Sequence, residues 1–219
     1  MNPKEFPRYV EMVQMAAQNW AGLLDVRLGL ESDYFPGFEG WLEKLHNSAE
    51  LHHVLGSVHH HMRYYRERYE TGSIEDFNRT YFELLARSAE SGLFDTLAHP
   101  DLVKNELPEH WSFELVRNDV ARALDRISKT GVAMELNTSG RFKALPEMNP
   151  SREQLRMMCE RSIPVVLGSD AHSPYRVGDH FAEALRILAE VGYQEVCHFI
   201  KRKPVKVKIS DALASLEMR

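Results

Sequence analysis

The residues best suited to chemistry in this sequence are polar side chains that directly follow apolar segments. They are Glu31 after LGL, His59 after GSV, His99 after TLA, Asn137 after MEL and Asp170 after VVLGS. Imidazole is the commonest ligand for transition metals, and a carboxylate can bridge metal ions or act as a general base. These residue types predict a metal-dependent active site.

Two short segments carry the strongest signals. In FDTLAHPDLVK, an apolar run leads to His99, Pro100 ends the strand, and Asp101 could orient the histidine or its loop. In GSDAH, Asp170 and His172 lie two residues apart beyond the apolar VVL. A carboxylate oxygen together with an imidazole nitrogen suits Zn, Mn or Fe.

The other histidines predict less, although the chain has 11 of them. His60 and His61 are expected to be solvated or to support the neighbouring ligands. His52 and His53 are expected at the surface. Ordinary structural or surface roles are expected for the isolated histidines, which are His46, His110, His180 and His198.

The elements that must position these residues alternate between helix and strand. Helical patterns cover residues 4–20, 37–48, 73–92, 112–130, 150–162 and 178–191, and strand patterns cover 23–31, 53–60, 94–101, 131–140 and 163–172. Alternation of this kind predicts α/β architecture with a parallel sheet. In a barrel, the carboxyl ends of such strands meet on one face, where enzymes build their sites. We expect one domain over residues 1–219.

Composition excludes several other classes of protein. The chain has 219 residues with a net charge of −5, which disfavours a nucleic-acid-binding face. There is no apolar run of membrane-spanning length and no secretory signal. Cys159 and Cys197 cannot form a disulfide framework. The sequence also lacks GxGxxG, P-loop, GxSxG and CxxC motifs, so a cytoplasmic protein with metal chemistry is the interpretation we adopt.

The motifs taken together resemble a known family. The segments GLESDYFPGFEGWL, LGSVHHH, FDTLAHPDLVK, ELNTSGRFK and VVLGSDAHSPYRVG follow one another as in the histidinol-phosphatase branch of the PHP (polymerase and histidinol phosphatase) superfamily. The resemblance implies a distorted (βα) barrel with up to three divalent metals at the strand ends. It also implies hydrolysis of L-histidinol phosphate to L-histidinol and phosphate by metal-activated water, a step of histidine biosynthesis.

The resemblance also implies a ligand set. Glu31 would bridge two metals, His59 and His99 would complete one of these sites, and Asp170 and His172 would serve the other two. Catalysis would rest on Glu31, His99 and Asp170. The HxH motif that opens the family is missing here, since no histidine precedes His46. We therefore expect one well-supported metal site, up to two weakened sites, and a barrel that is incomplete because its first βα units are missing.

The substrate is expected to be a small phosphorylated metabolite. Arg141, Lys143 and Arg176 lie in loops after predicted strands and could bind its phosphate, and Asn137 could contact the substrate. An exposed sheet edge could pair two copies into a homo-oligomer. Two other functions stay open. One is a PHP phosphoesterase for another small phosphomonoester, and the other is a metal-poor homologue that acts as a binding or interaction module.

Overall fold

The computed structural model describes residues 3–70 and 72–217. The strands are β1 (Gly29–Asp33), β2 (His53–Ser57), β3 (Thr96–Leu97), β4 (Ala133–Asn137), β5 (Val165–Gly168), β6 (Glu195–Ile200) and β7 (Lys203–Lys208). The α-helices are α1 (Phe6–Asn19), α2 (Glu39–His46), α3 (Arg63–Tyr69), α4 (Ile74–Glu90), α5 (Phe113–Ile127), α6 (Arg152–Glu160), α7 (Phe181–Val191) and α8 (Ile209–Glu217). The predicted α/β alternation is confirmed.

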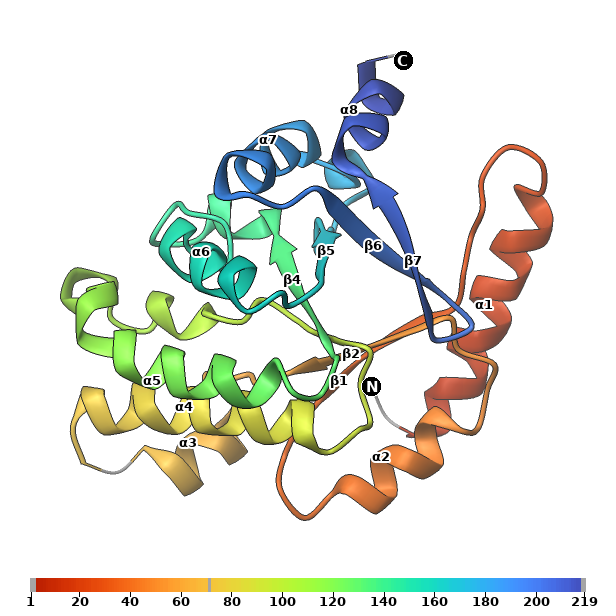
Figure 1. Cartoon of the computed structure of the whole chain (residues 1–219). Coiled ribbons are helices and arrows are strands. Elements are labelled where there is room, and N and C mark those ends of the chain that lie inside the picture. Colours follow the sequence, from red (N-terminus) through yellow and green to blue (C-terminus); the bar gives the residue numbers. More distant parts are fainter. Residues whose placement is uncertain (1–2, 71, 218–219) are drawn as a thin grey trace.

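The seven strands form one sheet in chain order. The pairs from β1 to β6 are parallel, and only β7 runs antiparallel, in a hairpin with β6. The sheet curls and brings its last hairpin close to β2, since the backbone N–H of Arg202 in the β6–β7 turn donates to the carbonyl of His52, just before β2, at 2.9 Å. Figure 1 shows the helices outside this curled sheet. The parallel order brings the carboxyl ends of β1 to β5 to one face.

The helices pack their apolar stripes against the sheet. Helices α4 and α5 lie side by side (Figure 1) and bury residues such as Tyr81, Leu85 and Leu124 in the main core. The predicted start of α4 near residue 73 is confirmed, and the Ser73 hydroxyl accepts from the backbone N–H of Asp76 in a capping box.

Several predicted strands are longer than the strands in the structure. The strand expected over 23–31 begins only at Gly29, because Leu23 is 82% exposed and follows a turn at Gly22 with φ of 83°. Glu31 is thus the middle residue of β1 and not its last. The strand expected over 94–101 has only two paired residues, and the one expected over 131–140 ends at Asn137, where a 3-10 helix (Thr138–Phe142) begins.

The sequence analysis missed two helices and the antiparallel pairing of the last two strands. Helices α3 and α8 were not predicted, and the last hairpin makes the sheet mixed and not purely parallel. Strand β7, which is rich in lysine, is largely exposed. No helix in the described part of the chain combines the length and the apolar character that crossing a bilayer requires.

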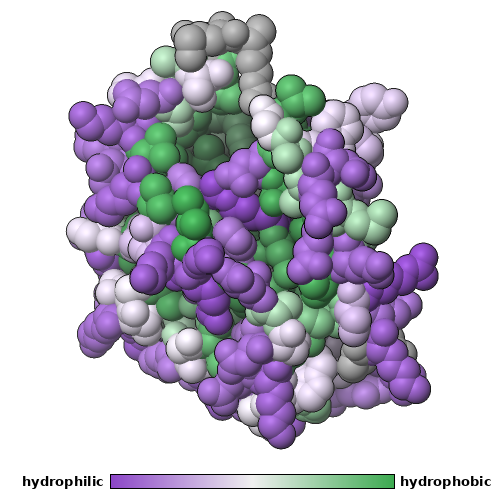
Figure 2. Space-filling model, turned by 90° about the vertical axis from the view of Figure 1, so that its right-hand side faces the viewer, coloured by the Kyte–Doolittle hydropathy of each residue, from purple (hydrophilic) through white to green (hydrophobic). Residues whose placement is uncertain are grey.

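Strand β1 lies at an edge of the sheet and pairs only with β2 among the described residues. Helix α1 lies beside it, and the Tyr9 hydroxyl donates to the carbonyl of Gly29 at 2.7 Å. Figure 2 views the molecule from this side and shows hydrophobic side chains in patches and around a hollow, among hydrophilic ones. The exposed apolar residues on α1 and the turn after it are Met12, Met15, Trp20, Leu23 and Leu24.

Candidate metal centre

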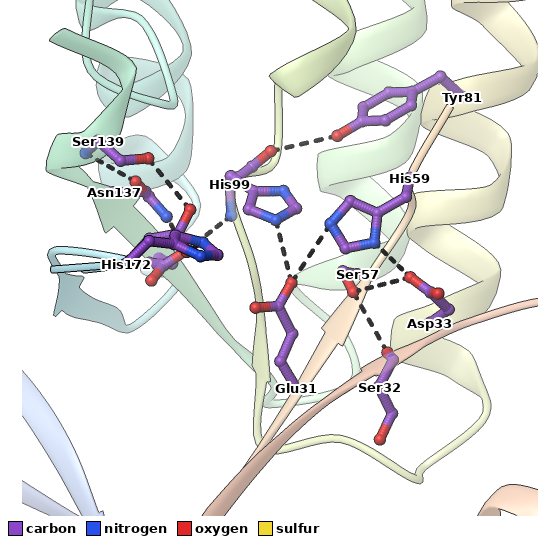
Figure 3. Close-up of polar contacts among 12 residues, drawn as sticks. Glu31, Ser32, Asp33, Ser57, His59, Tyr81, His99, Asn137, Ser139 and His172 are labelled. Atoms are coloured by element: carbon purple, nitrogen blue, oxygen red, sulfur yellow. Dashed lines mark hydrogen bonds and ion pairs between the residues drawn. The ribbon is translucent and has the colours of Figure 1, made fainter. Parts of the chain in front are cut away.

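Three of the predicted ligands meet at the carboxyl end of the sheet. Glu31, His59 and His99 each offer a ligand atom, and these atoms all lie within 4.8 Å of one another. Glu31 Oε1 is 3.1 Å from His99 Nε2 and 3.5 Å from His59 Nε2 (Figure 3). Within residues 3–70 and 72–217, no other group of three such side chains comes this close. Two imidazole nitrogens and one carboxylate oxygen are a donor set typical of catalytic zinc.

Asp33 orients one of the two histidines. It lies at the end of β1, and its carboxylate forms a hydrogen bond with Nδ1 of His59. Because Nδ1 then carries the proton, the lone pair of His59 is at Nε2, the atom that faces Glu31. The sequence analysis did not select Asp33. Its only signal was its spacing of two residues from Glu31 on a strand, which places both side chains on one face.

His99 is held through its main chain. Its φ of 29° lies in the left-handed region, its N–H donates to Glu135 at 2.8 Å, and its carbonyl accepts from the Tyr81 hydroxyl at 3.2 Å. Strained backbone of this kind persists only where neighbouring groups fix it. The hydrogen bonds of Asp101 go not to the His99 ring but to Lys104, Asn149 and the N–H of Ser151, and these bonds hold the loop after His99.

The electrostatics of the three side chains favour an ionised carboxylate beside the imidazoles. Burial alone would raise the pKa of Glu31, but the hydrogen bond and charge of His99 and the charge of His59 outweigh it and lower the pKa. Burial alone would lower the pKa of His99, but the hydrogen bond and charge of Glu31 raise it. The Glu31 carboxylate is therefore ionised, and a cation bound there would take the place of the proton that Glu31 favours on His99.

Glu135 is a buried carboxylate beneath the centre. One of its oxygens accepts both from the N–H of His99 and from the amide of Asn137 at 3.0 Å. Its other oxygen lies against Gly168, where no β-carbon would fit. Burial raises the pKa of Glu135, although the charge and N–H of His99 oppose this effect. Asn137 is itself buried and accepts from the N–H of Ser139, so both residues lie inside the site.

Asp170 and His172 form a separate pair. Asp170 accepts from the Ser139 hydroxyl at 3.1 Å, and its second oxygen is 3.2 Å from His172 Nε2 (Figure 3). The His172 side chain is 91% exposed. The charge of Asp170 still reaches His99, whose pKa it helps to raise. The structure thus brings Asp170 near the centre but leaves His172 on its open side.

The predicted phosphate-binding residues lie in the loops after β4 and β5. Arg141 pairs with Glu183, and the Arg176 guanidinium lies 3.5 Å from the centre of the Phe142 ring. In both arginines the Nε atom is buried without a hydrogen-bond partner. Lys143 is exposed, and its charge reaches His61 beside the metal centre.

The expectation that His53 lies at the surface was wrong, and so was one of the two roles expected for His60, that of a solvated side chain. His53 is not a surface residue: it bonds Thr96 at 2.8 Å and stacks on Phe199, and burial lowers its pKa to about 4. The charge of Asp95 opposes this shift. His60 is not solvated either, since it is buried and lies 3.2 Å from Glu106. In both cases contacts distant in sequence bury the ring.

Three other histidines meet the expectations, and the two cysteines are free thiols. Cys197 is buried, and neither cysteine is in a disulfide. His61 and His110 are exposed. His46 is buried, with its Nε2 3.1 Å from the Ser32 hydroxyl, which fits a structural role.

Comparison with known proteins identifies a family and named relatives. Residues 1–139 match the PHP domain family. A protein of Deinococcus radiodurans named "Probable histidinol-phosphatase" is 37% identical over 204 residues, which are 90% of this chain and 76% of that protein. A Schizosaccharomyces pombe protein of the same name is 25% identical over 215 residues, which are 89% of this chain and 69% of that protein.

The fold recurs in a solved structure. The histidinol phosphate phosphatase from Lactococcus lactis, crystallised with zinc, L-histidinol and phosphate, superposes with a TM-score of 0.77 at 18% identity. The match covers 91% of this chain and 79% of that one. The chain belongs to the PHP family, in its histidinol-phosphatase branch.

Proposed function

We propose that this protein hydrolyses L-histidinol phosphate to L-histidinol and phosphate with divalent metal held by Glu31, His59 and His99. The observation that carries the proposal is the convergence of their three ligand atoms within 4.8 Å of one another. Two further observations support the proposal. The relatives are named histidinol-phosphatase, and the Lactococcus lactis structure contains zinc, L-histidinol and phosphate.

The donor set fits a divalent cation. Two neutral imidazoles and one carboxylate leave coordination positions open, and Zn, Mn and Fe all accept such ligands. When bound, the cation supplies a Lewis acid that polarises a phosphoryl oxygen and lowers the pKa of a water molecule. The proposal includes Asp170 and His172 as ligands of further, weaker sites on the same face.

The protein's own residues supply orientation and charge. Asp33 keeps the proton of His59 on Nδ1, and Glu135 holds the main chain of His99 in place. Arg141, Lys143 and Arg176 would bind the phosphate, because guanidinium and ammonium groups match its negative oxygens. Asn137 would stabilise Glu135 and the floor of the site through its amide.

The test combines metal content with phosphate release. The protein is stripped of metal, reloaded with Zn or Mn, analysed for ions per chain, and assayed with L-histidinol phosphate. We expect metal-dependent phosphate release that His99→Ala abolishes, while His110→Ala at an exposed position retains it. Equal turnover in the two variants would remove His99 from the site.

The number of metal ions per chain distinguishes the proposed function from the two alternatives. If the wild type binds metal yet releases no phosphate from L-histidinol phosphate, a panel of small phosphomonoesters tests for a different substrate. If it retains no metal and no turnover on any of them, it is the metal-poor binding homologue, and the proposal fails.

Location and assembly belong to the same proposal. Two free thiols suit the reducing cytoplasm, where we place the protein. The unpaired edge of β1 and the exposed apolar side chains of α1 support a homo-oligomer across this side. Sedimentation with and without metal tests the assembly, and a monomer in both conditions would refute it.

A further inference from the structure

An apolar cavity lies beside the metal centre and has no role in the chemistry described so far. It has a volume of about 370 Å³ and is lined by Asp33, Phe35, Phe38, Trp41, Leu42 and Tyr64. The rings come from the loop after β1, from α2 and from α3. Five of the six lining residues are apolar or aromatic, and Asp33 is the only charged one.

The aromatic residues of this cavity are held in position, yet two remain open to solvent. The Phe35 ring meets Phe38 at 5.8 Å and Tyr64 at 5.1 Å between ring centres, both edge to face. Phe38 is nevertheless 55% exposed and Trp41 is 47% exposed. Large aromatic side chains that line a concave surface and stay exposed are typical of ligand sites.

Asp33 joins the cavity to the metal centre. The same carboxylate that lines the cavity also holds Nδ1 of His59, and Tyr64 hydrogen-bonds to it from the cavity side. Its side chain remains 36% exposed. A small molecule bound in the cavity would therefore lie next to the metal-binding side chains, and the Asp33 carboxylate would be close enough to attract a positive charge on it.

The two sides of the centre differ in charge. Figure 3 shows Asp33 on one side of Glu31, His59 and His99, and Asn137, Ser139 and His172 on the other. The cations Arg141, Lys143 and Arg176 belong to the loops after β4 and β5, on the Asn137 side. A phosphate suits the cationic side, and an aromatic or positively charged group suits the Asp33 side.

We propose that the cavity lined by Phe35, Phe38, Trp41 and Tyr64 binds the ring of the substrate and so selects phosphomonoesters that carry a planar, weakly basic aromatic group. This inference rests on the proposed function, because it assigns the organic half of the same substrate. Trp41 and Phe38 supply ring faces, and Asp33 attracts a protonated nitrogen.

The experiment compares two substrates in matched variants. L-Histidinol phosphate carries an imidazole, and ethanolamine phosphate is an amino-alcohol phosphomonoester without a ring. The quantity measured is the ratio of their kcat/KM values in the wild type, Trp41→Ala, Trp41→Phe and Trp20→Ala. Trp20 is the matched control, since it is also a half-exposed tryptophan, at 55%, but it lies at the end of α1.

The expected result is a loss of discrimination at Trp41 alone. Trp41→Ala should lower the ratio about tenfold, the loss that corresponds to about one aromatic contact. Trp41→Phe should restore most of it, and Trp20→Ala should match the wild type. An unchanged ratio in Trp41→Ala, or an equal loss in Trp20→Ala, would overturn the proposal. Thermal unfolding of each variant identifies any that fails to fold, in which case Phe38→Ala replaces it.

Binding of L-histidinol without phosphate separates this inference from the proposed function. Calorimetry with the metal-loaded protein should show binding that Trp41→Ala weakens about tenfold. If L-histidinol binds in this way but no phosphomonoester is hydrolysed, the cavity assignment stands and the phosphatase proposal fails. If L-histidinol phosphate is hydrolysed but Trp41→Ala changes neither the ratio nor the binding, the phosphatase proposal stands and the cavity assignment fails.

Discussion

Replacing Gly168 by alanine should disrupt the metal centre, because the added methyl group collides with Glu135. Gly168 is the last residue of β5, and its φ lies outside the left-handed region, so the backbone itself tolerates alanine. The added β-carbon would lie 2.7 Å from Cδ of Glu135 and closer still to Oε1. Because Glu135 is buried, its carboxylate cannot move into solvent. Gly168→Ala must therefore displace the group that holds the N–H of His99.

The size of the effect follows from these contacts. Overpacking a filled interior costs about 1–3 kcal/mol, and each lost hydrogen bond to a charged group adds about 1.5–3 kcal/mol. We expect Gly168→Ala to lower the free energy of unfolding by about 2–5 kcal/mol. Loss of the support for His99 should also weaken zinc binding about 10- to 100-fold, as is usual when a residue that orients a ligand is lost.

The measurements are urea unfolding and zinc competition with a chromophoric chelator. Gly40→Ala is the control, since a β-carbon there meets nothing within 4 Å on an exposed turn of α2. A double variant with Glu135→Ala should recover part of the unfolding cost of Gly168→Ala, because the colliding carboxylate is gone. Wild-type stability and zinc affinity in Gly168→Ala would refute the reasoning.

Three further perturbations follow from the structure. Asp33→Asn should weaken zinc binding about 10-fold or more, because the anionic group that fixes the tautomer of a ligand histidine is lost; the same chelator competition measures it, and unchanged affinity would contradict it. His53 has a pKa of about 4 in the fold against a usual 6.5, so the unfolded chain binds the extra proton. Stability should therefore fall as the pH drops from 6.5 towards 4, by up to about 1.4 kcal/mol per pH unit, and His53→Gln should flatten that slope in urea titrations. An equally steep slope in the variant would exclude His53 as its source. Lys104→Met leaves the buried carboxylate of Asp101 without its cation and should cost about 3–5 kcal/mol, whereas Lys206→Met, in an exposed pair, should cost less than about 1 kcal/mol. Similar losses in the two lysine variants would contradict this assignment.

Much of the site could be predicted from the sequence because its ligands follow apolar strands. The alternation of helix and strand signals implies a parallel sheet, and a parallel sheet brings Glu31, His59 and His99 to one face. This inference needs only local patterns, and it tolerated errors in strand length. The strand expected over 94–101 has two paired residues, yet His99 still emerges at the correct end.

The contacts of the supporting residues could not be predicted in the same way. Asp33, Glu135 and Tyr81 act on ligands 18 to 36 residues away, through bonds that exist only once the strands and helices have packed. The burial of His53 likewise depends on Phe199, in a strand near the other end of the chain. Hydrophobic periodicity reports the environment of one segment and contains no information about which distant segment will cover it.

The sequence by itself determined the chemical types of the ligands, their order and the face on which they gather, because residue type and strand direction are local properties. The tertiary structure decided which of those ligands meet. It joined Glu31, His59 and His99, left His172 exposed beside Asp170, and opened an aromatic cavity next to Asp33. Those outcomes depend on distances between side chains from different elements, and only the packed fold fixes such distances.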